Sequence, residues 1–345
     1  MIRLFVRFFT AAVLAILFAP AFPVLAQQHV PPAPPAQEAP ASSAQSAPAQ
    51  TSAEPSAPAP TAPLLPAPNP ADFTAASPTK EQVDAFLHAT WGYDDNVIFQ
   101  VHAILKTSVE GVSKVVVYYA DRAGKEKPQG LVLFTLPDGK HMVAGNDVVD
   151  FGANPFADTR RQVQEKADGP YRGSPSKDFE IVEFADFQCP HCKEAQANMD
   201  KLVADFPKAR VIFQNFPISS LHPEAAKAAE YGLCVSKQGS SSAFFQYAAA
   251  VFDGQDGLAT PDGATLTLNS AVAKAGLDPT KIAACAADPQ IKAQIGASVK
   301  LGSDLGINQV PTLVVNGRAV PANVPYDVLK KIVDFQVKFD GISGQ

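Results

Sequence analysis

Residues 184–192 read FADFQCPHC, and they join an apolar run to a segment with helical spacing. The run at residues 179–184 predicts a buried strand. Residues 193–206 predict a helix, and the proline that follows them ends it. The two cysteines of the stretch, Cys189 and Cys192, are therefore expected where a strand passes into a helix.

This position favours disulfide exchange at the two cysteines. Pro190 fits the first helical turn, where its missing N–H is not needed. The free N–H groups of that turn and the positive end of the helix dipole stabilise a thiolate on Cys189. His191 can add a hydrogen-bond donor or a positive charge beside the same sulfur. Cys192 follows one turn later and can close a small ring with Cys189, so we predict a redox-active pair.

A CxxC pair has three other common uses. A zinc site of this kind needs a second pair, but Cys234 and Cys285 stand far apart in the chain. A c-type haem needs a histidine directly after the second cysteine, where this chain has Lys193. A purely structural pair is rarely placed at a strand-to-helix junction. We therefore expect no metal site and no cofactor.

Two stretches of the chain resemble a known family. FQCPHC at residues 187–192 and VPTLVVNG at residues 310–317 are similar to the DsbA-like branch of the thioredoxin superfamily. The resemblance implies an α/β, thioredoxin-like catalytic domain at residues 174–341, with a helical insertion at about residues 221–305. It also implies that Val310–Pro311 is the cis-proline loop of that fold.

The chemistry of such an enzyme assigns roles to the residues of the CPHC motif. Cys189 is expected to be the attacking and attacked sulfur, because it begins the helix at its exposed end. Cys192 is expected to be the resolving thiol, and Pro190 and His191 are expected to tune the pair. The resemblance places the Val310 backbone against the cysteines, where it can pair with an extended substrate chain.

Glu183 stands six positions before Cys189, inside an otherwise apolar strand. A buried carboxylate is costly and often has a task. The resemblance implies an acidic residue here that assists proton transfer at the buried thiol. The alternative is that Glu183 points to solvent from one face of the strand.

Cys234 and Cys285 both fall in the expected helical insertion. An even number of cysteines in a secreted protein favours pairing, and the CxxC motif accounts for the other two. We therefore predict a structural disulfide between Cys234 and Cys285. The alternative is two free, buried thiols.

The N-terminal residues predict export. Residues 1–26 have a charged start, an apolar run and a VLA cleavage site, as in a secretory signal. The alternative, an uncleaved anchor, is opposed by two prolines and by the short run. Residues 27–78 are rich in alanine, proline and serine, which predicts a disordered linker. A periplasmic or secreted location follows, and four cysteines fit an oxidising compartment.

Residues 79–150 predict a small α+β domain, with a capping box at Thr79–Gln82 and several strand-like runs. LVLFTLPDGKHMVAG at residues 131–145 is similar to the end of the cystatin-like dimerisation domain of DsbC and DsbG; the alternative is an unrelated hairpin. The resemblance implies a homodimer. Residues 151–173 predict a linker helix followed by a boundary rich in glycine and proline.

Together these features predict a thiol–disulfide oxidoreductase that acts on unfolded or partly folded secreted proteins. A membrane redox partner is expected to reoxidise it. The formal net charge of -6 indicates no general attraction to nucleic acid. The CPHC motif and the insertion favour an oxidase, whereas the N-terminal domain favours a dimeric isomerase or reductase. An alternative of another class is a chaperone-like binder of unfolded proteins.

Overall fold

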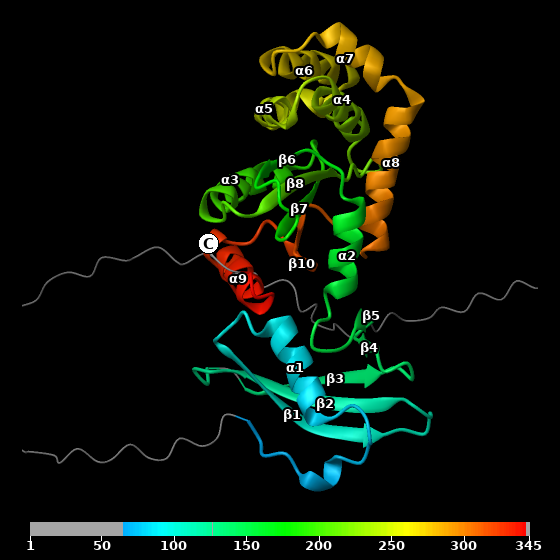
Figure 1. Ribbon diagram of the computed structural model, residues 1–345, viewed down its shortest axis with the longest axis vertical. Coiled ribbons are helices and arrows are strands. Elements are labelled where there is room, and N and C mark those ends of the chain that lie inside the picture. The colour runs from blue at the N-terminus through cyan, green and yellow to red at the C-terminus, as the bar shows by residue number, and fades with distance from the viewer. Residues whose placement is uncertain (1–64, 126, 343–345) are drawn as a thin grey trace, which may run out of the picture. The chain divides into compact units, whose positions relative to one another are not determined.

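The computed structural model describes residues 65–125 and 127–342 of the chain (Figure 1). The expected signal at residues 1–26 and most of the expected linker at 27–78 lie outside the described residues. Within the described ranges, no helix is long and apolar enough to cross a membrane. Two sheets of five strands each organise these residues.

The first sheet is antiparallel and follows chain order. Its strands are β1 Val97–Lys106, β2 Ser113–Asp121, β3 Gln129–Thr135, β4 His141–Ala144 and β5 Asp147–Asp150. Helix α1, Lys80–Trp91, begins at the expected capping box, because Thr79 and Gln82 each accept a hydrogen bond from the other's backbone N–H. The apolar side of α1 packs on one face of the sheet, and the alternating valines of β2 point into the same core.

The chain joins this first domain earlier than expected. The 3₁₀ helix η1, Pro70–Asp72, lies within the segment predicted to be disordered. Phe73 packs against the core of the first sheet, and the next two backbone N–H groups donate to the carbonyl of Ile104. The Ser113 hydroxyl donates to the carbonyl of Ser77. The expected end of the linker at residue 78 is therefore too late. One aromatic side chain and a few hydrogen bonds attach residues 70–78 to the first domain, although their composition is of low complexity.

The second sheet has the strand order β10-β9-β7-β8-β6. Its central strand β7, Glu180–Ala185, is buried at every position, as its continuous apolar run predicts. Strand β8, Arg210–Asn215, runs parallel to β7, and β9, Thr312–Val315, runs antiparallel on the other side. The edges are β10, Arg318–Pro321, and β6, Tyr171–Gly173.

Helices cover both faces of this sheet. Helices α3, Pro190–Asp205, and α9, Tyr326–Phe339, share a core with Ile181 of β7. Helices α2, Ala157–Lys166, and α8, Pro289–Asp304, share the opposite core with Val182 and Phe184. Successive residues of β7 thus point to opposite faces, which makes this domain a three-layer α/β structure.

The expected boundary at residue 174 also needs correction. Strand β6, Tyr171–Gly173, pairs with β8, and Val163 of α2 packs in the same core as Phe184. The segment expected to be a linker therefore belongs to the second sheet and its cover. Sequence reasoning missed β6 because three residues flanked by glycine and proline show turn signals and no measurable period.

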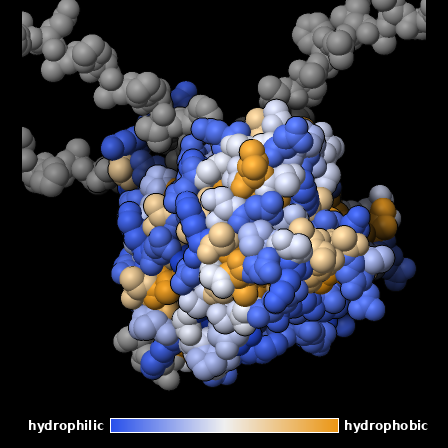
Figure 2. Space-filling model, turned by 90° about the horizontal axis from the view of Figure 1, so that it is seen from above, coloured by the Kyte–Doolittle hydropathy of each residue, from blue (hydrophilic) through white to orange (hydrophobic). Residues whose placement is uncertain are grey.

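A bundle of helices separates β8 from β9, as the resemblance implies. It contains α4 Ala225–Gln238, α5 Ser241–Asp253, the 3₁₀ helix η2 Gln255–Ala259, α6 Pro261–Lys274 and α7 Pro279–Ala286, and it continues into α8. Ser240, Thr260, Asp278 and Asp288 cap four of these helices with their side-chain oxygens. The face seen in Figure 2 carries hydrophobic side chains in small separate groups among hydrophilic ones, as is usual for a protein surface.

Candidate active site

Cys189 stands at the N-cap of α3, and Pro190 occupies the first helical position. Both cysteines of the motif are free thiols. Cys189 is 6% exposed and Cys192 is fully buried. Cys189 was expected at an exposed helix end, but it too is largely covered and is only slightly more exposed than Cys192. The carbonyl oxygen of Val310 lies 3.9 Å from Cys189 Sγ and contributes to this cover.

The two thiols have opposite tendencies to ionise. The hydrogen bond from the Cys192 thiol, with help from the backbone N–H groups of Cys192 and His191, lowers the pKa of Cys189 to about 6. Burial and the charge of Asp186 oppose this change. Burial raises the pKa of Cys192, and the same hydrogen bond adds to that rise. At neutral pH the pair therefore consists of a thiolate at Cys189 and a thiol at Cys192.

His191 contributes to the site differently from the expectation. Its Nδ1 lies 3.0 Å from Oε2 of Glu194, one turn further along α3, and this contact raises the pKa of His191. The exposed imidazole therefore faces Glu194, and it is the backbone N–H of His191 that lowers the pKa of Cys189. The positive ring still attracts the Cys189 thiolate at longer range.

Glu183 is 2% exposed on the central strand β7, so the alternative that it points to solvent does not hold. Gln196 Nε2 donates to Glu183 Oε1 at 2.8 Å and to the Cys192 carbonyl at 3.1 Å. Burial raises the pKa of Glu183 to about 7, although the hydrogen bond from Gln196 lowers it. The charge of Glu183 also contributes to the raised pKa of Cys192. We infer that this carboxyl group, which titrates near neutral pH, exchanges a proton with that thiol.

We expect Glu183→Gln to slow the step in which Cys192 leaves or attacks, by about 10²-fold at neutral pH, the low end of general acid–base catalysis. The inflection near pH 7 in the rate of that step should disappear with the carboxyl group. Rapid-mixing measurements of mixed-disulfide formation and resolution across the pH range would show both effects. Glu180→Gln is the matched control, since Glu180 is also a buried carboxylate of β7 but is the first residue of the strand, at the end opposite the redox pair. Equal effects of the two substitutions would contradict a proton-transfer role for Glu183.

The Val310–Pro311 peptide bond is cis, and it leads directly into β9. The contact of the Val310 carbonyl with Cys189 Sγ places this loop against the redox pair, as the family resemblance implied. An extended substrate chain that reached Cys189 would pass beside the backbone of this loop.

Sequence reasoning missed the glutamines that hold the active-site turn. Gln255 of η2 is buried and donates from Nε2 to the carbonyls of Phe187 at 2.9 Å and Cys189 at 3.0 Å. Gln188 in turn donates to the carbonyl of Leu258 at 3.0 Å. These bonds attach the turn to the helical insertion. The only signal in the sequence is a glutamine next to apolar helices, which does not identify its partner.

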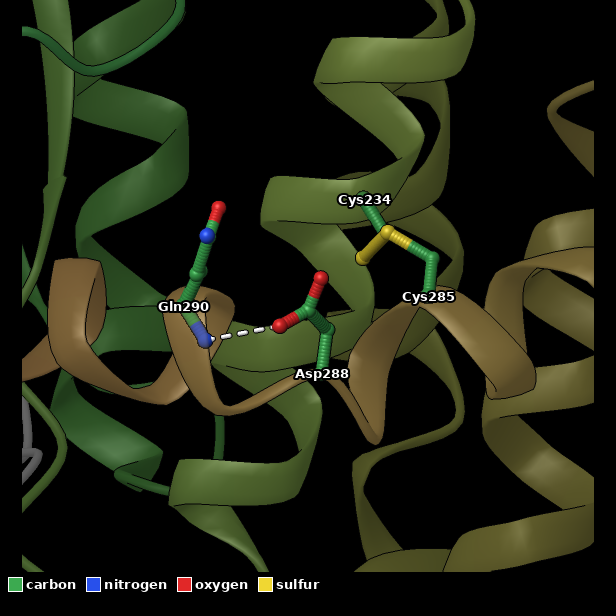
Figure 3. Close-up of a disulfide and its surroundings, with 4 residues drawn as sticks. All are labelled: Cys234, Cys285, Asp288 and Gln290. Atoms are coloured by element: carbon green, nitrogen blue, oxygen red, sulfur yellow. Dashed lines mark hydrogen bonds between the residues drawn. A yellow bond between two sulfur atoms is a disulfide. The ribbon is translucent and has the colours of Figure 1, made fainter.

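The insertion also carries the second pair of cysteines. Cys234 of α4 and Cys285 of α7 form a disulfide, with their Cα atoms 6.0 Å apart (Figure 3). Figure 3 also shows Asp288 accepting the hydrogen bond from the Gln290 backbone that starts α8. Among residues 65–125 and 127–342, no group of three or more His, Cys, Asp and Glu side chains is placed to hold a metal ion.

Comparison with known sequences identifies related proteins. The sequence profile of the thioredoxin family matches residues 165–335. The Na(+)/H(+) antiporter NhaA 3 of Salinispora tropica is 29% identical over 147 residues, which are 43% of this chain and 21% of that protein. The probable disulfide bond formation protein D of Bacillus cereus is 26% identical over 200 residues, which are 56% of this chain and 86% of that protein. The chain thus spans about a fifth of the length of the antiporters it matches.

A solved structure, that of a thioredoxin-like oxidoreductase from Silicibacter pomeroyi, is 27% identical to this chain, with a TM-score of 0.44. The alignment covers 52% of this chain and 98% of that one. The α/β fold with a helical insertion that the sequence predicts is confirmed. Given this fold and the family match at residues 165–335, the C-terminal domain belongs to the thioredoxin superfamily of thiol–disulfide oxidoreductases.

Proposed function

We propose that this chain is a periplasmic or secreted enzyme that passes its Cys189–Cys192 disulfide to unfolded or partly folded proteins. The observation that carries the proposal is the placement of the pair, with Cys189 at the N-cap of α3 and Cys192 fully buried behind it. In this arrangement the pKa of Cys189 is lowered to about 6 and that of Cys192 is raised. A stabilised thiolate favours the reduced enzyme, so the oxidised enzyme gives up its disulfide readily. The oxidase direction is therefore the favoured one.

Each step of this reaction balances electrons and protons. A substrate thiolate attacks Cys189 Sγ of the enzyme disulfide, and Cys192 leaves as a thiolate that takes a proton, for which protonated Glu183 is the donor. A second substrate thiolate then attacks the substrate sulfur of the mixed disulfide, and Cys189 leaves as the thiolate. The substrate has lost two electrons, and the enzyme holds them as two reduced cysteines. A membrane redox partner would restore the enzyme disulfide.

We expect the rate at which a thiol reagent alkylates Cys189 in the reduced protein to be half-maximal near pH 6, because only the thiolate reacts. The reduced protein also gains stability from this lowered pKa. That gain is complete above the ordinary thiol pKa of ~8.5 and is lost as the pH falls through about 6.

The control is Cys192→Ala, which removes the hydrogen bond that contributes most to the lowered pKa. Its midpoint should move toward the ordinary thiol value. A midpoint of ~8.5 already in the wild-type protein would show an ordinary thiol and remove the basis of the proposal.

The proposed location rests on the expected signal at residues 1–26 and on the Cys234–Cys285 bond. Structural disulfides form and persist in oxidising compartments and are rare in the cytosol. Substrates in such a compartment would be newly exported chains with free cysteines.

A second candidate, a dimeric isomerase or reductase, is favoured by the first sheet. Val132, Phe134 and Val148 expose 42%, 38% and 62% of their surface. Val132 and Phe134 stand on β3 and Val148 stands on β5, and Val143 of β4, the strand between them, pairs with both Phe134 and Val148. An exposed apolar group of this kind is typical of an interaction surface, and we propose that a second copy of the chain covers it.

We expect light scattering to show a dimer of the full chain at micromolar concentration. Phe134→Lys should weaken association at least ~10-fold, which is about 1.4 kcal/mol. Val109→Lys is the control, since Val109 is also an exposed apolar residue of this domain but stands in the turn between β1 and β2. A wild-type monomer at this concentration would leave the first domain with another role.

A further inference from the structure

The carboxylate of Asp186, in the turn between β7 and α3, receives three N–H groups. Oδ1 accepts from the Gln188 backbone at 2.7 Å, and Oδ2 accepts from the Ile218 backbone at 2.8 Å. Oδ2 also lies 2.9 Å from Nδ1 of His222, in the loop between β8 and α4. The Asp186 side chain is completely buried, and that of His222 is mostly buried. A carboxylate only accepts hydrogen bonds, so His222 Nδ1 carries the hydrogen of this contact.

Asp186 also contacts both cysteines of the redox pair through its backbone. Its N–H donates to Cys192 Sγ at 3.4 Å, and its carbonyl accepts from the Cys189 N–H at 3.2 Å. Its negative charge acts on the same sulfur that becomes a thiolate, and raises the pKa of Cys189. The site therefore contains a buried charge that opposes the thiolate, and an imidazole placed to compensate that charge.

We propose that Asp186 and His222 set the reduction potential of the Cys189–Cys192 pair, with Asp186 disfavouring the Cys189 thiolate and His222 limiting that effect. The inference rests on the proposed function, because it concerns the potential of the same pair. A thiolate that is less stable makes the reduced enzyme less stable and the disulfide a weaker oxidant. His222 is a positioning residue, since it acts on the sulfur only through Asp186.

The two residues should therefore have opposite effects when each is replaced. Asp186→Asn removes the charge and should raise the equilibrium constant for reduction of the pair by about 10-fold, the effect of one unit of thiol pKa, or about 30 mV for a two-electron couple. His222→Leu leaves the charge without its imidazole partner and should lower that constant by about 3- to 10-fold. His222→Asn keeps an N–H donor and should lie between His222→Leu and the wild type. It also supplies the test if His222→Leu does not fold.

The measurement is the fraction of reduced protein in buffers of reduced and oxidised glutathione, with the midpoint of Cys189 alkylation as a second readout. In the Asp186→Asn background, His222→Leu should change neither readout further, because it acts through the missing charge. A merely structural role would loosen the turn and move both single variants in the same direction, which would overturn the inference. Unchanged constants in both variants would overturn it as well.

The glutathione measurement also distinguishes failure of the inference about Asp186 and His222 from failure of the proposed function. If the wild-type pair does not equilibrate with glutathione at all, the proposed function fails and the inference falls with it. If the wild-type pair equilibrates and the variants match it, only the inference fails.

Discussion

Cys189→Ser should abolish disulfide exchange with protein substrates. Cys192→Ser cannot form the enzyme disulfide, but its Cys189 thiolate should still attack a disulfide of a scrambled substrate and accumulate the mixed disulfide. The reason is the asymmetry of the pair: Cys189 carries the thiolate and lies beside the Val310 carbonyl, while Cys192 is fully buried. Loss of the attacking sulfur should cost at least ~10⁴-fold in rate, as for the removal of other enzymic nucleophiles. Cys192→Ser removes the enzyme disulfide, and with it the oxidation of reduced substrates, and it also removes the thiol that would resolve a mixed disulfide at Cys189.

The measurement is the refolding of one multi-disulfide protein from its reduced form and from its scrambled form. The wild-type chain should act faster on the reduced form, and Cys189→Ser should act on neither. Strong isomerisation beside poor oxidation by the wild type would favour the isomerase instead. Suppression of aggregation by Cys189→Ser, together with no exchange by the wild type, would favour the chaperone-like binder.

The direction of the reaction depends on two parts of the chain. A Cys189 thiolate with a pKa of about 6 is a good leaving group but a weaker nucleophile, which suits a single transfer better than repeated attack on wrong disulfides. The first domain opposes this tendency if its apolar face pairs two copies, since a shared cleft would hold a misfolded chain through several attempts. The intrinsic chemistry and the assembly are therefore separate determinants, and substitutions at Phe134 separate them.

The parts of the site that sequence reasoning predicted depend on local patterns. The buried strand β7, the start of α3 at Pro190 and the roles of the two cysteines all follow from a short stretch of chain. The turn of His191 toward Glu194 was not predicted, although it too is local, since residues three apart on a helix are neighbours.

The parts that were missed depend on contacts between distant segments. Gln255 reaches a carbonyl 66 residues away, and His222 reaches a carboxylate 36 residues away. Neither residue has a motif around it, so only the packing of the insertion against the active-site turn identifies its partner. Strand β6 was missed for a similar reason, because its pairing with β8 and not its own pattern makes it a strand.

Opening the Cys234–Cys285 disulfide should lower the free energy of unfolding by about 4 kcal/mol in the chain-entropy model, because the bond closes a loop with a sequence separation of 51. The cleanest comparison uses a chain in which Cys189 and Cys192 are both alanine, so that a strong reductant opens only this bond and removes no side chain. Urea unfolding with and without reductant then gives the difference directly. Equal midpoints would show that the insertion does not depend on the bond.

Without the Cys234–Cys285 disulfide, the active site should also become disordered at a lower urea concentration than the one that unfolds the whole domain. Gln255 stands in the insertion between α5 and α6, and it holds the Phe187 and Cys189 carbonyls. If the bond between α4 and α7 limits the motion of the insertion, the double variant Cys234→Ala with Cys285→Ala should lose exchange activity at a lower urea concentration than the one that unfolds the second sheet. Gln255→Leu should cause the same early loss with the disulfide intact, because it cuts the contact and leaves the bond. Activity that disappears only together with the fold in both variants would show that the insertion supports the domain without positioning the redox pair.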